Sequence, residues 1–335
     1  MRIVIDAFGG DNAPLEIVKG ACDASKEFGV DITLTGNEEE INKVIKENNL
    51  VFSGDLKIVH TDDVISMDDD PTTILKTHKE SSMGIAFKEL SEDRADAFVS
   101  AGSTGAIVVG GTLIVKRIKG VKRPALGSMI PSPTGNPYLL MDMGANAECR
   151  PEMLAQFGVM ASVYVENVEG VKNPKIGLLN IGTEDSKGDT LHQEAYKLLE
   201  KAPLNFVGNI ESREMPKGIC DAVITDGFTG NIALKLMEGT ISTMFKLVKN
   251  TMMKGFLNKI AALILKKDLY DLKSTFNSSA IGGAPLLGVK KPVIKAHGSS
   301  DALAIKNAIR QAVNFAKRDV VGIISEKLAE TGEEQ

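Results

Sequence analysis

Residues 222–235 read AVITDGFTGNIALK, and the fold class follows from this stretch. An apolar run typical of a buried strand leads into a glycine-containing turn, and a helical pattern begins directly after it. Four further strand–turn–helix units begin at the apolar runs 97–100, 138–141, 175–179 and 292–295. Such alternation predicts an α/β fold in which helices cover both faces of a mostly parallel sheet.

The same alternation extends through most of the chain, starting with a strand at residues 3–5 and a helix near Leu15. Residues 240–273 differ, because they have helical periodicity throughout, interrupted near Gly255, and no strand pattern. The length of 335 residues exceeds the usual domain size of about 100–200 residues. We therefore expect a single two-lobed α/β unit over residues 1–331, with a protruding helical segment at 240–273 and a polar tail at 332–335.

Composition excludes several classes of protein. The formal net charge of −5 argues against a protein that coats nucleic acid. Three cysteines without C-x-x-C spacing indicate neither a zinc ribbon nor a disulfide framework, and they fit a reducing cytoplasm. The histidines have no metal-ligand spacing, so no metal and no cofactor are expected. No signal peptide is expected, because Asp6 comes too early for the apolar core of one, and no membrane span is expected, because no run of about 18 uncharged apolar residues occurs.

The turns after the predicted strands are the expected ligand site. Carboxyl ends of parallel strands meet at one edge of a sheet, where ligands bind, so we expect all five turns to meet there. Glycines allow close approach of the backbone, and helix N-termini present N–H groups to anions, which favours an anionic substrate. The expected phosphate- or substrate-binding residues are Gly102, Ser103, Thr104, Gly105, Asp142, Gly144, Asn146, Asn180, Gly182, Glu184, Gly227, Thr229 and Gly230. One such turn alone could equally cap a helix, but five together favour a ligand site.

A smaller set of residues is expected to carry the chemistry. These candidate catalytic residues are Lys187, Asp226, Asn231, Lys235 and His297. The first turn is expected to support the site through Asp6, Gly9, Gly10 and Asp11. A catalytic triad of Ser299, His297 and Asp301 is disfavoured, since the three are adjacent in sequence and G-x-S-x-G is missing. His297 is then either a phosphate donor or a structural histidine.

The run GSTGAIVVGG at 102–111 has neither the Gly-Lys-Ser/Thr ending of a P-loop nor GxGxxG spacing. ATP hydrolysis and an ordinary nicotinamide site are therefore both disfavoured. Basic residues cluster at 116–123 and again along 246–267. Each cluster is either a solvated face or a docking surface for an acidic protein.

The segment 240–273 contains an amphipathic helix. Its apolar face consists of Phe256, Leu257, Ile260, Leu263 and Ile264, with Lys259 and Lys266 opposite. That face could lie on an anionic membrane surface, or pack against its own protein or a second subunit. The residues alone favour packing, since amphipathic helices usually bury their apolar stripe in protein.

Seven motifs resemble those of the bacterial phosphate acyltransferase family, in the same order and over nearly the whole chain. They are IDAFGGDNAP (5–14), PTTILKTHKESSM (71–83), SAGSTGA (100–106), DMGANAECRP (142–151), NIGTEDSKG (180–188), DGFTGN (226–231) and AHGSSD (296–301). One departure is Phe8, where that family more often has methionine. The resemblance implies transfer of a fatty acyl group from acyl carrier protein to inorganic phosphate, giving acyl phosphate for phospholipid (phosphatidic acid) synthesis.

The resemblance also implies a homodimer and a cytoplasmic protein peripherally associated with an anionic membrane surface. It implies a fold like those of isocitrate/isopropylmalate dehydrogenases and phosphotransacetylase, and it shifts the expectation for residues 240–273 toward membrane or partner contact. Phosphate is already a nucleophile and a thiol is a good leaving group with a pKa of about 8.5, so no strong general base is needed. Glycine-turn amides with Lys187 and Lys235 would hold the phosphate, and N–H or hydroxyl donors would stabilise the oxyanion.

Two alternatives remain open. A hydroxyacid dehydrogenase on the related fold is disfavoured by the missing dinucleotide-binding fingerprint. A membrane-associated lipid-sensing or scaffold module would bind acyl carrier protein without turnover, and its motif-dense turns would then lack a role.

Overall fold

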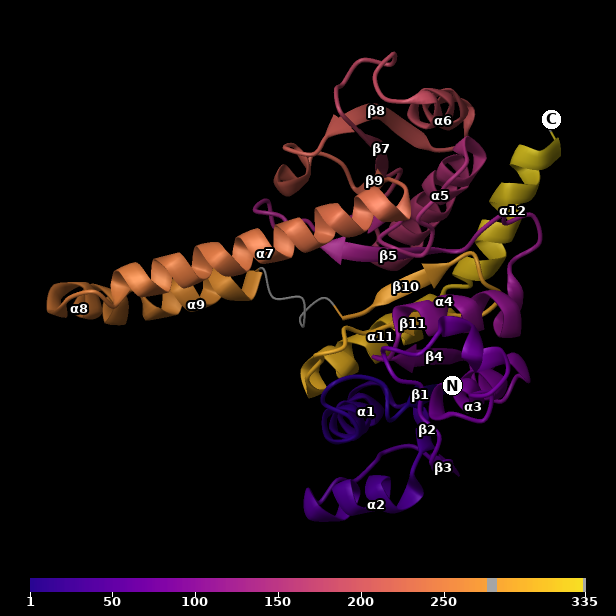
Figure 1. Cartoon of the computed structure of the whole chain (residues 1–335), viewed down its shortest axis with the longest axis vertical. Coiled ribbons are helices and arrows are strands. Elements are labelled where there is room, and N and C mark those ends of the chain that lie inside the picture. The colour runs from indigo at the N-terminus through magenta and orange to yellow at the C-terminus, as the bar shows by residue number, and fades with distance from the viewer. Residues whose placement is uncertain (276–281, 334–335) are drawn as a thin grey trace.

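The computed structural model describes residues 1–275 and 282–333, and its centre is one continuous eleven-stranded sheet (Figure 1). The strand order is β3-β2-β1-β4-β11-β10-β5-β6-β9-β7-β8. The strands are β1 (Arg2–Asp6), β2 (Asp31–Gly36), β3 (Leu56–His60), β4 (Ala97–Ser100), β5 (Ala125–Ile130), β6 (Tyr138–Met141), β7 (Lys175–Asn180), β8 (Asn205–Glu211), β9 (Ala222–Ile224), β10 (Ala284–Leu287) and β11 (Val293–Lys295).

Helices cover both faces of this sheet, which confirms the predicted fold class. The α-helices are α1 (Leu15–Phe28), α2 (Glu38–Glu47), α3 (Ser82–Ser91), α4 (Thr104–Gly110), α5 (Pro151–Tyr164), α6 (Thr190–Lys201), α7 (Gly227–Met252), α8 (Phe256–Ile264), α9 (Lys266–Thr275), α11 (Ala302–Lys317) and α12 (Val320–Glu333). Short 3-10 or π turns are η1 (Pro71–Leu75), η2 (Gly111–Lys116), η3 (Val165–Glu169) and η4 (Met215–Lys217). Side-chain caps fix several helix starts, as where Asn37 accepts from the Glu40 N–H at 3.0 Å.

Two groups of parallel strands point in opposite directions. The first strand group is β3, β2, β1, β4 and β11, and the second is β6, β9, β7 and β8. Between them β10 and β5 pair antiparallel with their neighbours and with each other, and these three antiparallel pairings leave the second strand group running opposite to the first. The expectation that all five turns meet at one edge is therefore wrong. The turns after β1, β4 and β11 lie at one edge, and those after β6, β7 and β9 at the other.

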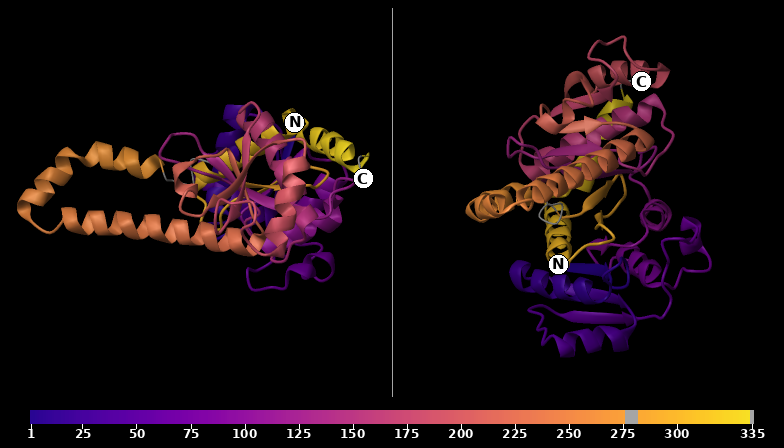
Figure 2. Two further views of the ribbon diagram at one scale, coloured as in Figure 1. Left: turned by 90° about the horizontal axis from the view of Figure 1, so that it is seen from above. Right: turned by 60° about the vertical axis from the view of Figure 1, so that its left-hand side comes forward.

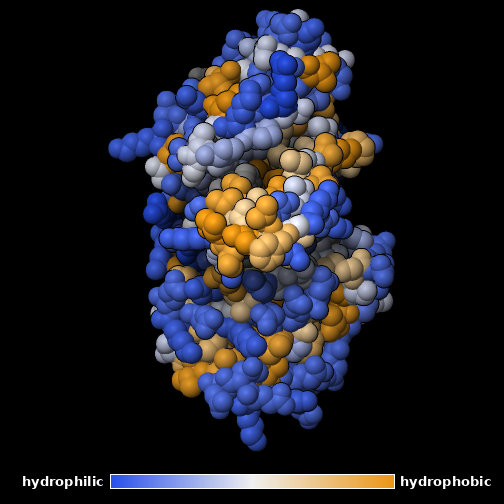
Figure 3. Space-filling view, turned by 90° about the vertical axis from the view of Figure 1, so that its left-hand side faces the viewer, coloured by the Kyte–Doolittle hydropathy of each residue, from blue (hydrophilic) through white to orange (hydrophobic). Residues whose placement is uncertain are grey.

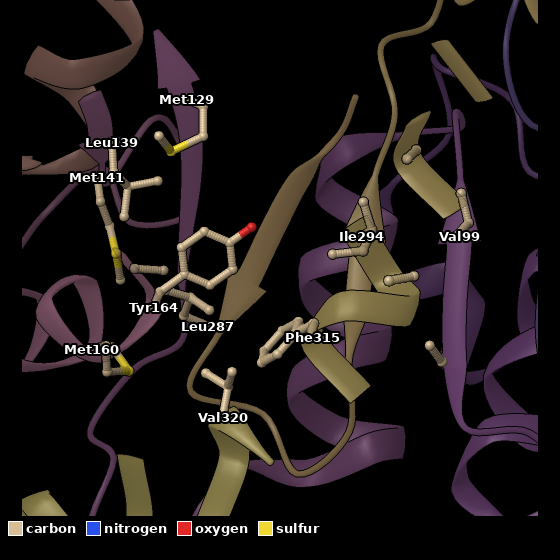
Figure 4. Packing of buried hydrophobic residues seen from close by; sticks show 14 of the residues in the cluster. Val99, Met129, Leu139, Met141, Met160, Tyr164, Leu287, Ile294, Phe315 and Val320 are labelled. Carbon is tan, nitrogen blue, oxygen red and sulfur yellow. The ribbon is translucent and has the colours of Figure 1, made fainter. Parts of the chain in front are cut away.

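The hydrophobic core differs between the two faces of the sheet. One face carries a continuous cluster in which Tyr164 of α5 and Phe315 of α11 meet edge to face, 5.9 Å between ring centroids (Figure 4). The opposite face carries two separate clusters, one under α3 and α4 and the other under α7. Side chains alternate along β5, so Leu126 joins the first of these clusters and Ile130 the second. This divided face is the one on which α7 lies.

A helical arm projects from the body (Figures 1 and 2). The inner turns of α7 pack on the sheet through Ala233, Leu234 and Met237, and the outer turns continue outward to α8 before α9 returns. The interruption predicted near Gly255 is confirmed, since α7 ends at Met252 and Gly255 caps α8. At the other end, α12 extends into the expected tail as far as Glu333, and residues 334–335 lie outside the described part.

Apolar side chains gather at the end of this arm (Figure 3). Phe256, Leu257, Leu263 and Ile264 of α8 are each more than 70% exposed. Nothing in the described part of the chain covers this face. None of its helices is both long and apolar enough to cross a bilayer.

Candidate active site

Helix α7 starts among the turns of the second strand group and carries polar residues along one side. It begins at the carboxyl end of β9, where the Asp226 carboxylate accepts from the Thr229 N–H at 2.9 Å. Asn231, Lys235 and Glu238 follow at i, i+4 and i+7, so they share one side of the helix. We call these three residues the polar side of α7. The turn after β6 lies against this side at Asn231, and the charges of Lys235 and Glu238 act on Lys295 at the end of β11.

The turn after β6 is organised around the buried carboxylate of Asp142. This carboxylate accepts from the N–H groups of Leu126 (3.0 Å), Gly144 (3.3 Å), Ala145 (3.1 Å) and Asn146 (2.7 Å), and from the Asn146 side-chain amide (2.9 Å). Burial raises the pKa of Asp142 above its ordinary value, and the hydrogen bonds oppose that rise. With its oxygens used in this way, Asp142 holds the turn in shape rather than facing a ligand directly.

The first turn of α7 packs directly on the Asp142 turn. The Gly227 N–H donates to the Asn146 carbonyl at 2.8 Å. A Cβ on Gly230 would lie 1.9 Å from the carbonyl oxygen of Asp142, so only glycine fits there. At Gly144 the added carbon would lie 3.3 Å from the amide nitrogen of Asn231, which places this turn beside the polar side of α7.

Replacing Gly230 with alanine is therefore expected to lower the free energy of unfolding by about 1–3 kcal/mol, because backbone must move to admit the methyl group. Gly239→Ala on the same helix is the matched control, since its Cβ would meet nothing within 4 Å. It should raise stability by about 0.8 kcal/mol through helix propensity. Urea denaturation measures both, and equal effects of the two substitutions would contradict the close approach.

The turn after β7 is fastened by two asparagines. The Asn180 side chain donates to the Lys187 carbonyl at 3.1 Å and accepts from the Ile181 N–H at 2.8 Å. Asn209 of β8 donates to the Glu184 carbonyl at 2.7 Å. The ammonium of Lys187 lies 3.8 Å from the Glu184 carboxylate, with both side chains on the surface. Gly182 is buried beneath them. Sequence reasoning missed Asn209, although a polar amide within a strand was a signal.

The first strand group ends in three polar residues on one face. Asp6, Ser100 and Lys295 terminate the neighbouring strands β1, β4 and β11. Alternation places all three on the side of Val4, Phe98 and Val293, the divided face on which α7 lies. Ser100 donates to Asp6 at 2.7 Å and accepts from the Gly102 N–H at 3.0 Å.

Asp6 is the buried carboxylate of this row. Burial raises the pKa of Asp6, and the hydrogen bond from Ser100 opposes the rise. A Cβ on Gly9 would lie 2.6 Å from the Asp6 carboxylate and 2.7 Å from the Gly102 nitrogen. Gly9 therefore lets the first turn close on the glycine turn before α4. The supporting role expected of the first turn stays a prediction.

The remaining predicted residues at this edge cap helices or pair locally. Ser103 caps α4 by accepting from the Ala106 N–H at 3.5 Å, and Thr104 and Gly105 begin that helix. The Asp11 N–H donates to the Gly298 carbonyl at 2.8 Å, next to Gly10. His297 is exposed and contacts the Ser299 hydroxyl at 2.9 Å. The Asp301 carboxylate accepts from the Ala304 N–H at 2.8 Å as the cap of α11, and the structure assembles no triad from these described residues.

Two of the predicted catalytic residues, Asn231 and Lys235, lie on the polar side of α7. Asn231 lies against the Asp142 turn, and Lys235 and Glu238 act electrostatically on Lys295. Lys187 and His297 instead have partners within their own turns. Sequence reasoning missed Lys295, although a lysine ending an apolar strand was a signal. Among the described residues, no group of three or more His, Cys, Asp or Glu could hold a metal ion.

Comparison with known proteins gives full-length relatives. The family model described as fatty acid synthesis protein matches residues 1–322. A phosphate acyltransferase of Oceanobacillus iheyensis is 45% identical over 332 residues, covering 99% of this chain and 98% of that protein. A phosphate acyltransferase of Bacillus licheniformis is 44% identical over 335 residues, covering 100% of both chains.

Solved structures share the fold at low identity. A phosphotransacetylase from Streptococcus pyogenes superposes with a TM-score of 0.66 at 18% identity, over 95% of this chain and 94% of that one. A 4-hydroxythreonine-4-phosphate dehydrogenase from Klebsiella pneumoniae gives a TM-score of 0.52 at 12% identity, over 94% of this chain and 99% of that one. At these identities the likeness concerns the fold alone.

Proposed function

The chain belongs to the fatty acid synthesis protein family, in which its full-length relatives are phosphate acyltransferases, and we propose that it transfers a fatty acyl group from acyl carrier protein to inorganic phosphate. The observation that carries this proposal is the 45% identity along 99% of the chain. The product, an acyl phosphate, would serve phospholipid synthesis. A dehydrogenase on the related fold is supported by likeness of fold at low identity alone, 12% for the Klebsiella pneumoniae enzyme.

In the proposed reaction a phosphate oxygen attacks the thioester carbonyl carbon. The tetrahedral intermediate then expels the thiolate of the carrier, leaving acyl phosphate. The attacking anion is charged at neutral pH and the thiol is a good leaving group, so holding the reactants and stabilising charge would supply most of the catalysis. Lys235 on the polar side of α7 and Lys187 on the β7 turn would hold phosphate, with Asn231 and turn N–H groups as donors to the oxyanion.

The arm supports a peripheral association with membrane in this proposal. The exposed apolar face of α8 would enter the acyl boundary of an anionic membrane, and the surrounding lysines would meet its headgroups. A second copy of the chain, in a homodimer, would complete the assembly, and acyl carrier protein, which is acidic, would dock on the basic stretch 116–123. That stretch adjoins the Asp142 turn, since the Asn146 side chain donates to the Pro124 carbonyl at 2.8 Å.

The test mixes purified protein with acyl-acyl carrier protein, with and without phosphate. Free thiol is followed while hydroxylamine traps acyl phosphate. Phosphate-dependent thiol release with trapped product supports the proposal. Binding of the carrier protein or of vesicles without release would favour a lipid-sensing or scaffold module instead.

Lys187→Ala is expected to raise the KM for phosphate about tenfold, since a charged donor to the anion is lost. The same thiol-release assay at limiting phosphate measures this effect. Lys197→Ala on α6 is the control, because that lysine lies in the helix following the β7 turn and not in the turn itself. Kinetics of Lys187→Ala that match the wild type at limiting phosphate would remove Lys187 from the site.

A further inference from the structure

Lys295 is the feature of the divided face that the reaction as described leaves unused. It ends β11, in register with Ser100 on β4 and Ala284 on β10. Its neighbour Ile294 belongs to the continuous core, so alternation places Lys295 on the divided face, on the same side as Val293. The ammonium group of a lysine in this position is partly buried. Burying a positive charge costs free energy unless a negative group lies close to it.

The surroundings of Lys295 do not provide full compensation. Its ammonium has no hydrogen bond or ion pair with any residue in the ranges 1–275 and 282–333. Burial lowers the pKa of Lys295, the charge of Glu238 opposes this effect, and the charge of Lys235 adds to it. Among the described residues, Glu238 is thus the carboxylate whose charge opposes the lowering of the Lys295 pKa, and the charge of Lys235 counteracts it.

Resting on the proposed function, we propose that Lys295 is a further substrate-binding residue, and that its ammonium holds the phosphate together with that of Lys235. A dianion between two ammonium groups would offset both their mutual repulsion and the loss of hydration at Lys295. Two point charges of this kind suit a compact phosphate, whose oxygens accept from several donors at once.

The hydrogen bonds of Asp6 and Ser100, next to Lys295 at the ends of β1 and β4, fit this proposal. Ser100 lies between Asp6 and Lys295 on adjacent strands, and its hydroxyl donates a hydrogen bond to the Asp6 carboxylate. The Asp6 carboxylate is thus engaged by Ser100 and by the Phe8 N–H at 3.3 Å. Because these hydrogen bonds engage the Asp6 carboxylate, Asp6 does not pair with Lys295. The ammonium of Lys295 is therefore available to bind a phosphate.

The test uses the full chain with inorganic phosphate as the probe, in two independent readouts. Lys295→Met should raise the KM for phosphate about tenfold while kcat stays within about twofold, the pattern of lost ground-state binding. The rise in Tm that phosphate produces in the wild type should disappear in Lys295→Met, and Lys295→Arg should restore part of it. Lys290→Met, an exposed lysine just before β11, is the control and should keep wild-type behaviour.

An unchanged phosphate KM and an unchanged phosphate-induced Tm rise in Lys295→Met would overturn the inference. So would a wild-type protein whose Tm does not respond to phosphate. If Lys295→Met does not fold, Lys295→Arg and Lys295→Gln give the same comparison. Absence of acyl transfer in the wild type would contradict the proposed function alone, because the Tm readout needs no turnover.

Discussion

Lys235→Met is expected to lower kcat/KM for phosphate about 100-fold, the size of effect seen when one preorganised donor to a developing charge is removed. Lys235 lies on the same side of α7 as Asn231 and Glu238 and acts electrostatically on Lys295. Methionine keeps the length and apolar stem of lysine, so the loss should reflect the charge. The thiol-release assay at varied phosphate measures it.

Lys246→Met is the matched control for this substitution. Lys246 is exposed on the outer part of the same helix, away from both sets of turns, and its replacement should leave kcat/KM within about twofold. Similar losses in both variants would show that the arm's general charge is responsible. Full activity in Lys235→Met would remove the polar side of α7 from the site.

The double substitution of Leu257→Glu with Leu263→Glu is expected to abolish binding to anionic vesicles. Both side chains are exposed on α8, at 78% and 73%. Each leucine buried in the acyl boundary contributes about 1.5–3 kcal/mol, so losing two should lower the partition coefficient more than 100-fold. Co-sedimentation with vesicles containing phosphatidylglycerol measures the effect.

Val51→Glu with Val207→Glu is the control pair, since these exposed valines lie on the body and receive the same added charge. The control should keep most of its vesicle binding. Equal loss in both pairs would point to simple charge repulsion. If the α8 pair keeps vesicle binding but becomes monomeric in solution, the face is an interface between copies of the chain.

Sequence reasoning located the strand–turn–helix units well because each depends on local chemistry. The unit that begins at 175–179 is found as β7 and α6, and Asp189 caps α6 by accepting from the His192 N–H at 3.0 Å. The reversal of strand direction could not be predicted in the same way. It depends on the short strands β5 and β10, whose antiparallel pairing is a long-range property without a periodicity signal of its own.

That reversal also limited the prediction of the site. Asp142 and Asp226 were correctly placed at strand ends, but their carboxylates accept backbone hydrogen bonds in the structure. Lys295 was missed, because its position at a strand end does not reveal that the charges of Lys235 and Glu238, on a helix that follows the other strand group, act on it. The turns and helix caps can be predicted from the sequence, because they depend on neighbouring residues. Which residues far apart in the chain lie close together depends on the topology of the whole sheet.

Phosphorus-31 NMR of the complete reaction tests the central claim most directly. With protein, acyl-acyl carrier protein and inorganic phosphate together, we predict a new acyl phosphate resonance that grows as free thiol is released. Omitting the protein, or replacing it with Lys235→Met, should remove or strongly slow that signal. Thiol release by the wild type without any acyl phosphate resonance, in the presence of phosphate, would contradict the assignment of phosphate as the acyl acceptor.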